Sequence, residues 1–158
     1  MIFKELIVQD VYQVADYYRD LVNHIQEETD DDYFLDISVS MDSIVEGLLS
    51  SLNDDAKMVF VAKDKDKVAG FIAGEIVDCF LPITKVKKVG NISAAYVVPI
   101  YRGKGILQEL ESMIQDFFKQ RGLKYIELNV LSQNQIGITS WGRLGYSTFR
   151  EQMRKEIK

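Results

Sequence analysis

The segment from Val97 to Ile106 brings together groups that bind an anion. An extended apolar run ends there in a short basic turn with Gly103 and Gly105, and an amphipathic helix follows at once. Glycines let backbone N–H groups approach a ligand closely, and the first turn of a helix offers unpaired N–H groups at the positive end of its dipole. Arg102 and Lys104 would add charge-assisted hydrogen bonds to the same anion. The segment therefore predicts a site for a phosphorylated cofactor.

Two common phosphate-binding loops are excluded by their spacing. The run from Gly103 begins like a dinucleotide-binding fingerprint, but Gln108 stands where that fingerprint needs its third glycine. The sequence contains no GxxxxGK[ST] string either. A basic glycine turn that opens a helix can also be purely structural, and that alternative stays open here.

The composition is typical of a soluble globular protein and argues against several classes of function. The chain has 158 residues, of which 47% are apolar and 27% charged, and we expect a single domain over residues 1–158. Its formal net charge of −5 argues against a nucleic-acid partner. Cys79 and His24 are the only residues of their types, so disulfide scaffolds, metal sites and Ser–His or Cys–His catalysis have little support. The N-terminus lacks an apolar signal region and no apolar run approaches roughly 18 residues, so we expect a cytoplasmic protein without a membrane partner.

The elements that must position this segment alternate between strands and helices. Apolar residues at helical spacing predict helices over 11–25, 106–121 and 135–144, and a further helix that Ser40 would cap and that carries Ile44, Leu48, Leu49 and Leu52. β-rich runs predict strands over 2–8, 58–62, 68–76, 91–98, 125–131 and 146–157, while residues 80–89 read as a loop or a strand edge.

This order and several motifs resemble the GCN5-related N-acetyltransferase (GNAT) superfamily. Arg102 and Gly105 match its acetyl-CoA signature [RQ]xxGx[GA], although Leu107 stands where glycine or alanine is usual. Residues 59–74 resemble its central hairpin, and residues 128–146 resemble its C-terminal pattern of LxV, Asn and YxxLGF. The resemblance implies an α/β (α+β) fold in which a mixed, mostly antiparallel twisted sheet of six to seven strands is flanked by about four helices.

The resemblance also implies a cofactor, acetyl-CoA, and the residues that hold it. The backbone around Tyr96, Val97 and Val98 would pair with the pantetheine arm, and an N–H near Val98 would bind the thioester carbonyl oxygen. The pyrophosphate would lie on the turn and the start of the helix, which are Arg102, Gly103, Lys104, Gly105, Ile106 and Leu107. Asn134 would contact the pantetheine region or simply cap the next helix, and Trp141 would form a wall of the cofactor tunnel.

Two positions depart from the family in ways that affect the proton transfers. Asn129 stands where the related branch often has a glutamate base, and Trp141 stands in place of the usual tyrosine acid, so neither role can be assigned there. Glu75 and Glu127 are the substitute candidates for the base, although both could be solvated strand residues. Tyr96 or a solvent molecule would return the proton. No metal is expected in the reaction.

The resemblance implies direct transfer of an acetyl group from acetyl-CoA to a primary amine of a small molecule or a peptide N-terminus. The acidic run from Glu27 to Asp32, with Tyr33 and Phe34 beside it, would attract a cationic amine if it faces the cleft, and is otherwise a solvated loop. The alternative function is an acyl-CoA-binding regulatory or interaction module with little catalysis, which Asn129 and Trp141 favour. Transfer of a different acyl group and assembly as a homodimer stay open.

Overall fold

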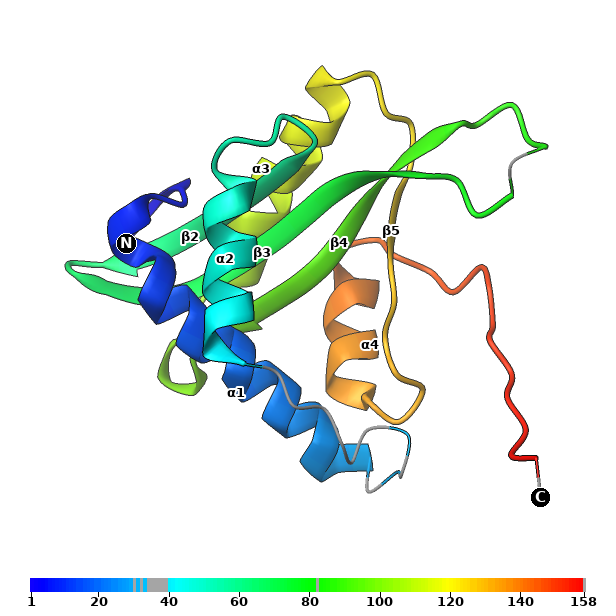
Figure 1. The fold of residues 1–158 in the computed structure, drawn as a ribbon, viewed down its shortest axis with the longest axis horizontal. Helices are drawn as coiled ribbons and strands as arrows, with labels where there is room; N and C mark the ends of the chain where they lie inside the picture. Colours follow the sequence, from blue (N-terminus) through cyan, green and yellow to red (C-terminus); the bar gives the residue numbers. More distant parts are fainter. Residues whose placement is uncertain (30, 32, 34–39, 82, 158) are drawn as a thin grey trace.

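The computed structural model describes residues 1–29, 31, 33, 40–81 and 83–157, and it contains one five-stranded sheet covered by helices on both faces (Figure 1). The strands lie in the order β1-β2-β3-β4-β5, with β1 to β4 antiparallel and β5 parallel to β4. Their bounds are β1 Ile2–Glu5, β2 Lys57–Asp64, β3 Lys67–Asp78, β4 Lys88–Val97 and β5 Ile126–Leu128. The helices are α1 Val11–Thr29, α2 Met41–Ser51, α3 Ile106–Gln120 and α4 Gln135–Arg143, with short 3-10 turns η1 Val8–Asp10 and η2 Pro99–Tyr101.

The sheet is buried on both faces along its centre. In β3, residues 68–74 are buried without interruption, a pattern that requires cover on both sides. Helices α1 and α2 pack on one face, against side chains such as Phe71 and Ala94. Helix α3 packs on the other face, against Ile72 and Ile92, and Trp141 of α4 joins that cluster. We call the first the α1/α2 face and the second the α3 face.

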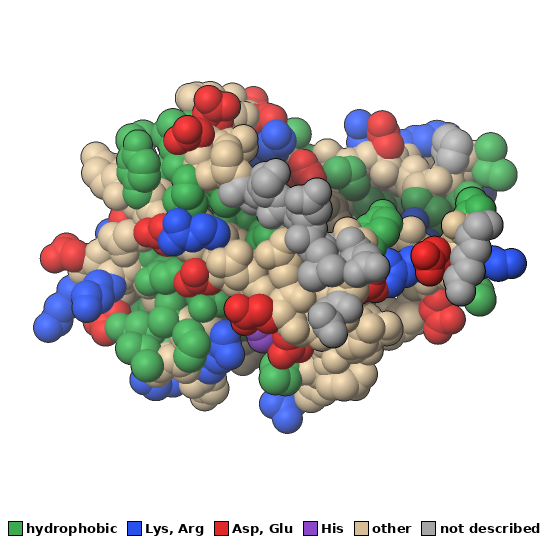
Figure 2. Space-filling model, turned by 60° about the horizontal axis from the view of Figure 1, so that its bottom comes forward, with side chains coloured by type: hydrophobic (Ala, Val, Ile, Leu, Met, Phe, Trp, Pro, Cys, Tyr) green, Lys and Arg blue, Asp and Glu red, His purple; other side chains and the backbone are tan. Residues whose placement is uncertain are grey.

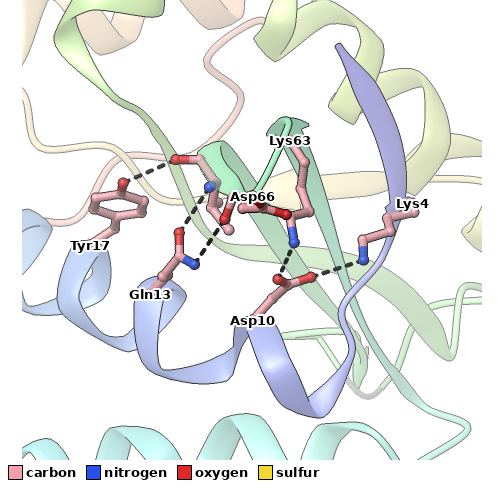
Figure 3. A network of polar contacts seen from close by, with 7 residues as sticks. Lys4, Asp10, Gln13, Tyr17, Lys63 and Asp66 are labelled. Atoms are coloured by element: carbon pink, nitrogen blue, oxygen red, sulfur yellow. Dashed lines mark hydrogen bonds and ion pairs between the residues drawn. The ribbon is translucent and has the colours of Figure 1, made fainter.

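A buried polar network fixes the start of α1 to the β2–β3 hairpin (Figure 3). The Asp10 side chain is only 2% exposed; it accepts a hydrogen bond from Lys63 Nζ at 2.5 Å and forms an ion pair with Lys4 Nζ at 3.0 Å. The Gln13 side chain donates to the carbonyl oxygen of Asp66 at 3.1 Å and accepts from the N–H of Val68 at 3.0 Å. Because both contacts go to backbone groups of the hairpin, α1 is held in register with β3.

The predicted fold class is confirmed, and most predicted elements are present with shifted bounds. Ser40 caps α2 as predicted, since its side chain accepts a hydrogen bond from the N–H of Ser43 at 3.1 Å. The predicted first helix continues to Thr29, and β3 continues to Asp78. Among the described residues, no helix is long and apolar enough to cross a membrane.

The prediction of six to seven strands is wrong for the C-terminal part of the sheet. β5 has three residues instead of the seven predicted over 125–131, and residues 146–157 form no strand. A β-rich sequence becomes a strand only where a neighbouring strand accepts its backbone hydrogen bonds. No described residue of the chain provides that neighbour beyond β5, so the predicted last strand is an extended segment.

Candidate functional site

The sheet opens where β4 and β5 diverge, and this opening is the centre of the candidate site. The two strands pair only at Gly90, Asn91 and Ile92 of β4, opposite residues 126–128 of β5. A bulge at Ser93 follows, because Ile92 and Ala94 have partners in β3 while Ser93 has none in the register. From Ser93 to Val97, β4 continues without a partner strand on its β5 side among the described residues. An extended ligand therefore has an open strand edge to pair with.

The direction of the backbone groups shows which amide faces this opening. The Val98 N–H donates to the carbonyl oxygen of Ala69 in β3 at 3.0 Å, so it is already used. Because backbone groups alternate along an antiparallel strand, the N–H of Val97 points the other way, toward the opening. The Val97 carbonyl oxygen accepts from Arg102 Nε at 2.9 Å. The expected donor near Val98 is thus the Val97 amide rather than that of Val98.

The predicted anion-binding turn joins this strand edge to α3. Gly103 and Gly105 have φ values of +75° and +77°, a left-handed conformation that glycine adopts without strain. No side chain caps Gly105, and the first hydrogen bond within α3 is from the Glu109 N–H to the Gly105 carbonyl oxygen at 3.1 Å. The N–H groups of Ile106, Leu107 and Gln108 therefore lack helical partners. They form a site at the positive end of a 15-residue helix, which suits a phosphate.

Side chains of the turn keep this geometry in place. The Tyr101 hydroxyl donates to Asp64 Oδ2 at 2.9 Å, which ties the turn to the β2–β3 hairpin and raises the pKa of Tyr101. Lys104 Nζ lies 5.3 Å from the centre of the Tyr101 ring. Arg102 and Lys104 are exposed, so their charges remain available to an anion on the turn. Leu107 is half-buried as the second residue of α3.

Helix α4 begins at Asn134 and carries Trp141. The Asn134 Oδ1 atom accepts a hydrogen bond from the Gly137 N–H at 2.8 Å, so the capping role is confirmed. A Cβ atom on Gly137 would lie 2.6 Å from Asn134 Nδ2, so a larger residue there would force the Asn134 side chain to move. Trp141 packs edge to face on Tyr146, with ring centres 5.4 Å apart. The Tyr146 hydroxyl donates to the buried Glu111 of α3 at 2.9 Å, and burial together with that carboxylate raises the pKa of Tyr146.

The two glutamates predicted as alternative bases lie in one row across the sheet. Glu75 of β3 pairs with Asn91 of β4, and Asn91 pairs with Glu127 of β5. Ile126 and Leu128 pack on the α3 face, so Glu127 between them points to the α1/α2 face. This row is one residue before the last pair of β4 and β5, at the base of the opening. Sequence reasoning found both glutamates but not Asn91, because the register that joins them is not visible in the sequence.

Tyr96 lies further along β4 on the same α1/α2 face, within a cluster of aromatic rings. It stacks on Tyr17 of α1 with ring centres 5.5 Å apart, and Arg102 lies 5.8 Å from its ring centre. Tyr18 stacks on Phe71 at 5.4 Å. The pKa of Tyr18 is raised, mainly by burial and further by the nearby charge of Glu75. A hydrogen bond with Ser93 lowers this pKa but does not outweigh the other two effects. Neither Tyr17 nor Tyr18 is among the site residues predicted from the sequence.

Part of the acidic run at the end of α1 is already paired. Asp31 forms an ion pair with Arg154, whose guanidinium carbon lies 5.2 Å from the ring centre of Tyr33. Asp30, Asp32 and Phe34 lie outside the described residues. On the face drawn in Figure 2, acidic and basic side chains are interspersed, without a continuous basic patch. No group of three or more metal-binding side chains occurs in the part of the chain that the structure describes.

Sequence comparison agrees with this architecture. The model of the acetyltransferase (GNAT) family matches residues 13–146. An uncharacterised N-acetyltransferase of Methanocaldococcus jannaschii is 32% identical over 88 residues, which make up 55% of this chain and 38% of that protein. The match therefore spans less than two fifths of the length of that relative.

Solved structures with the same fold cover nearly the whole chain. A tetramutant of the BH1408 protein from Bacillus halodurans has a TM-score of 0.80 at 23% identity, over 99% of this chain and 100% of that one. The aminoglycoside 6'-N-acetyltransferase AAC(6')-IG from Acinetobacter haemolyticus has a TM-score of 0.79 at 15% identity, over 100% and 99%. AAC(6')-Iy, in complex with the bisubstrate analogue CoA-S-monomethyl-acetylneamine, has a TM-score of 0.80 at 13% identity, over 99% and 97%. At these identities the structures show a shared fold only. The family model, however, matches most of the sequence, and the chain therefore belongs to the GNAT family of acetyltransferases.

Proposed function

We propose that this protein is an N-acetyltransferase that takes an acetyl group from acetyl-CoA and transfers it directly to a primary amine. The observation that carries the proposal is the continuity between two features: the open edge of β4 from Ser93 to Val97, and the unpaired N–H groups at the start of α3. Together they offer a strand-like partner for an extended arm and an anion site for its phosphates. Acetyl-CoA, when bound, supplies an acetyl thioester and a thiol leaving group.

We assign a group of this chain to the pyrophosphate, the thioester and the pantetheine arm of acetyl-CoA. The Gly103–Leu107 backbone would hold the pyrophosphate, with Arg102 and Lys104 adding positive charge. The Val97 N–H, which faces the opening, would donate to the thioester carbonyl oxygen. Trp141 would line the cofactor-binding tunnel on the side of α4. Asn134 Oδ1 already accepts the capping hydrogen bond from the Gly137 N–H, so the Nδ2 group is the part of Asn134 that would contact a ligand.

The amine would approach from the α1/α2 face. An alkyl ammonium group has a pKa near 10.4 and must lose a proton before it can attack, so a proton acceptor is needed beside the opening. Glu75 and Glu127 flank Asn91 at the base of the opening and are our candidates for this acceptor, directly or through a water molecule. Tyr96, on the same face of β4, or solvent would return a proton to the thiolate.

The acceptor we propose is a small-molecule amine or a peptide N-terminus. Two of the similar structures are aminoglycoside acetyltransferases, enzymes for polycationic small molecules, and the net charge of −5 on this chain fits a cationic acceptor. We also propose a cytoplasmic location, which fits the free Cys79.

The second candidate function is an acyl-CoA-binding module with little catalysis. It is favoured by Asn129 and Trp141, because neither side chain can exchange a proton near neutral pH. Both candidates require the cofactor, so binding alone does not separate them.

The deciding experiment measures thiol release with acetyl-CoA and a panel of polyamines, aminoglycosides, amino acids and short peptides. Acetyl-CoA binding is measured in parallel by calorimetry. Turnover that depends on one amine class establishes the transferase and its acceptor. Tight binding without turnover on any amine supports the binding module, and absence of acetyl-CoA binding removes both.

A further inference from the structure

Helix α1 carries two successive tyrosines whose hydroxyl groups have different partners. The Tyr17 hydroxyl donates to the carbonyl oxygen of Val68 at 3.0 Å, a backbone group at the start of β3 (Figure 3). The Tyr18 hydroxyl forms its hydrogen bond with the side chain of Ser93 in β4 instead. Tyr17 therefore fixes the helix to the β2–β3 hairpin, whereas the Tyr18 hydroxyl lies at the bulge where the candidate site opens.

The core holds the ring of Tyr18 in place. The ring stacks on the fully buried Phe71 of β3, with ring centres 5.4 Å apart and an angle of 23° between the ring planes. Stacking on a fixed ring restricts the side-chain torsions of Tyr18, so its hydroxyl oxygen is held beside the bulge. Tyr18 is half-buried and Ser93 is exposed, so a small ligand in the opening can reach this pair.

The hydrogen bonds of Ser93 set the direction of the Tyr18 hydroxyl. Ser93 Oγ donates to the carbonyl oxygen of Ala73 at 3.4 Å. A serine hydroxyl has a single hydrogen, so toward Tyr18 its oxygen is the acceptor and Tyr18 is the donor. The proton of Tyr18 is then used, and its oxygen presents only lone pairs to a further partner. Because burial raises the pKa of Tyr18, this hydroxyl stays neutral near neutral pH.

A carboxylate lies near this oxygen. Glu75 follows Ala73 by two residues in β3, and since Ala73 packs on the α1/α2 face, Glu75 points to that face as well. Ile92 packs on the α3 face, so Ser93 after it points to the α1/α2 face. The Glu75 charge acts on Tyr18 and adds to the rise of the Tyr18 pKa. Two hydrogen-bond acceptors, one neutral and one anionic, therefore face the same part of the opening.

We propose that Tyr18 binds the acceptor amine: its oxygen accepts one N–H of the ammonium group while Glu75 accepts another, and Ser93 positions the Tyr18 hydroxyl. The inference rests on the proposed function, because it names the residue that receives the amine of that reaction. An alkyl ammonium group has three N–H donors and no acceptor, which complements this pair. When Glu75 or Glu127 takes one proton, the electron pair of the broken N–H bond stays on nitrogen. Tyr18 still holds a second N–H, and the lone pair is free to attack the acetyl carbon.

Ligands of other chemistry fit this pair less well. A carboxylate or a phosphate has no donor for either acceptor and is repelled by Glu75. An alcohol has one O–H and satisfies only one of the two acceptors. A quaternary ammonium group is attracted by the Glu75 charge but has no N–H for the Tyr18 oxygen. The pair therefore selects N–H groups and not charge alone.

The test compares the binding of spermidine with that of its permethylated, quaternary analogue. Calorimetry measures both on the full chain, with and without coenzyme A, which lacks the acetyl group and so allows no turnover. The two probes carry the same charge, but the analogue has no N–H group. The native chain should bind spermidine about tenfold more tightly, since hydrogen bonds to charged groups are strong. Tyr18→Phe keeps the ring on Phe71, and it should lose most of this preference because spermidine alone binds more weakly.

Tyr17→Phe is the matched control, because it makes the same change one residue away. Its hydroxyl is bonded to a backbone carbonyl, so this variant should unfold at a lower temperature and keep the native preference. Ser93→Ala should reduce the preference, since Ser93 acts through Tyr18. The double variant Tyr18→Phe/Ser93→Ala should then show the same preference as Tyr18→Phe alone. Circular dichroism verifies that each variant is folded.

Three results would overturn the proposal. They are a native chain that binds the two probes equally or not at all, a Tyr18→Phe variant that keeps the native preference, and one that weakens both probes to the same extent. Failure of the proposed function looks different: the native chain would not bind coenzyme A, or would bind it without acetylating any amine. A preference for spermidine that depends on Tyr18 would support the inference in that case too.

Discussion

Glu75 and Glu127 lie in the same row of the sheet, one on each side of Asn91 in β4. The two residues are 52 positions apart in the sequence, and the parallel pairing of β5 with β4 is what brings them together. Neighbouring strands are about 4.8 Å apart, so the Glu75 and Glu127 side chains are attached to the backbone about 10 Å from each other, with Asn91 between them.

This row leads to the first prediction, on the proton acceptor. Replacing the acceptor by glutamine should lower kcat by about 10²- to 10⁴-fold, because the ammonium group would lose its proton only to water. We therefore expect one of Glu75→Gln and Glu127→Gln to show that loss, together with the loss of the acidic limb of the pH–rate profile. Glu46→Gln, on the exposed side of α2, is the control. Two variants with native kcat and native pH profiles would exclude both glutamates.

The second prediction concerns the left-handed turn before α3. Gly105→Ala should destabilise the turn by about 1–2 kcal/mol, since alanine is strained at a φ of +77°. Because the strain is relieved by turning the first N–H groups of α3 away from the phosphates, the Kd for acetyl-CoA should rise at least several-fold. Gly47→Ala in α2 is the matched control, where the same change should raise stability by about 0.5–1 kcal/mol. Calorimetry and thermal unfolding check both, and equal Kd values in the two variants would contradict the assigned anion site.

The third prediction separates the two roles of Asn134. Asn134→Ala removes the cap of α4 and should cost about 1 kcal/mol of stability. Asn134→Asp keeps a capping oxygen but loses the Nδ2 donor. If that donor contacts the cofactor, the aspartate variant will bind acetyl-CoA more weakly while unfolding at the native temperature. Native affinity in the aspartate variant would leave Asn134 with the capping role alone.

The fourth prediction is a pH dependence of stability that comes from Asp10. Burial alone would raise the pKa of Asp10, but hydrogen bonds from Lys63 and Lys4 outweigh burial and lower it. A carboxyl whose folded-state pKa lies below its unfolded value near 3.9 stabilises the protein above that pH, and this contribution disappears as the pH falls through the folded-state pKa.

Asp10→Asn should therefore destabilise the protein by about 3–5 kcal/mol at pH 7, because it leaves two lysines beside a neutral group. The difference between variant and native protein should shrink as the pH is lowered below 4. Urea unfolding at pH 7, 5 and 3 measures it. The exposed Asp16→Asn gives the control, and a difference that stays constant with pH would refute the role assigned to the charge.

The fifth prediction concerns the acidic run after α1. Neutralising Asp30, Asp31 and Asp32 together should raise KM for cationic amines by several-fold and leave KM for acetyl-CoA unchanged. Because Asp31 is paired with Arg154, the change Arg154→Ala should free that carboxylate and lower KM for the same amines. Unchanged KM for every accepted amine in the triple variant would show that the run is a solvated loop.

The parts of the fold that could be predicted from the sequence are those with short-range causes. The apolar stripe of α3, the Ser40 cap and the glycine turn at residues 103–105 depend on residues within a few positions of each other. The strands predicted over 58–62 and 68–76 are present as β2 and β3, and the short turn between them joins elements that are adjacent in the chain.

The parts that were missed depend on partners far away in the sequence. Residues 146–157 have a strand-like composition, but no strand among the described residues lies beside them to accept their backbone hydrogen bonds. The row of Glu75, Asn91 and Glu127 depends on strand register, and the bulge at Ser93 shifts that register by one residue. The contact of Tyr17 with Tyr96 joins α1 to β4 over nearly 80 positions, and no local pattern contains it.

Trp141 is the only tryptophan among 158 residues, and it lies on α4 against Tyr146, where we propose that the cofactor passes. Indole emission from this protein therefore originates at one known point. On the proposed cofactor path, acetyl-CoA changes the polarity around that single ring. The chain would then contain its own optical reporter, and binding of acetyl-CoA should be visible in real time without attaching a dye.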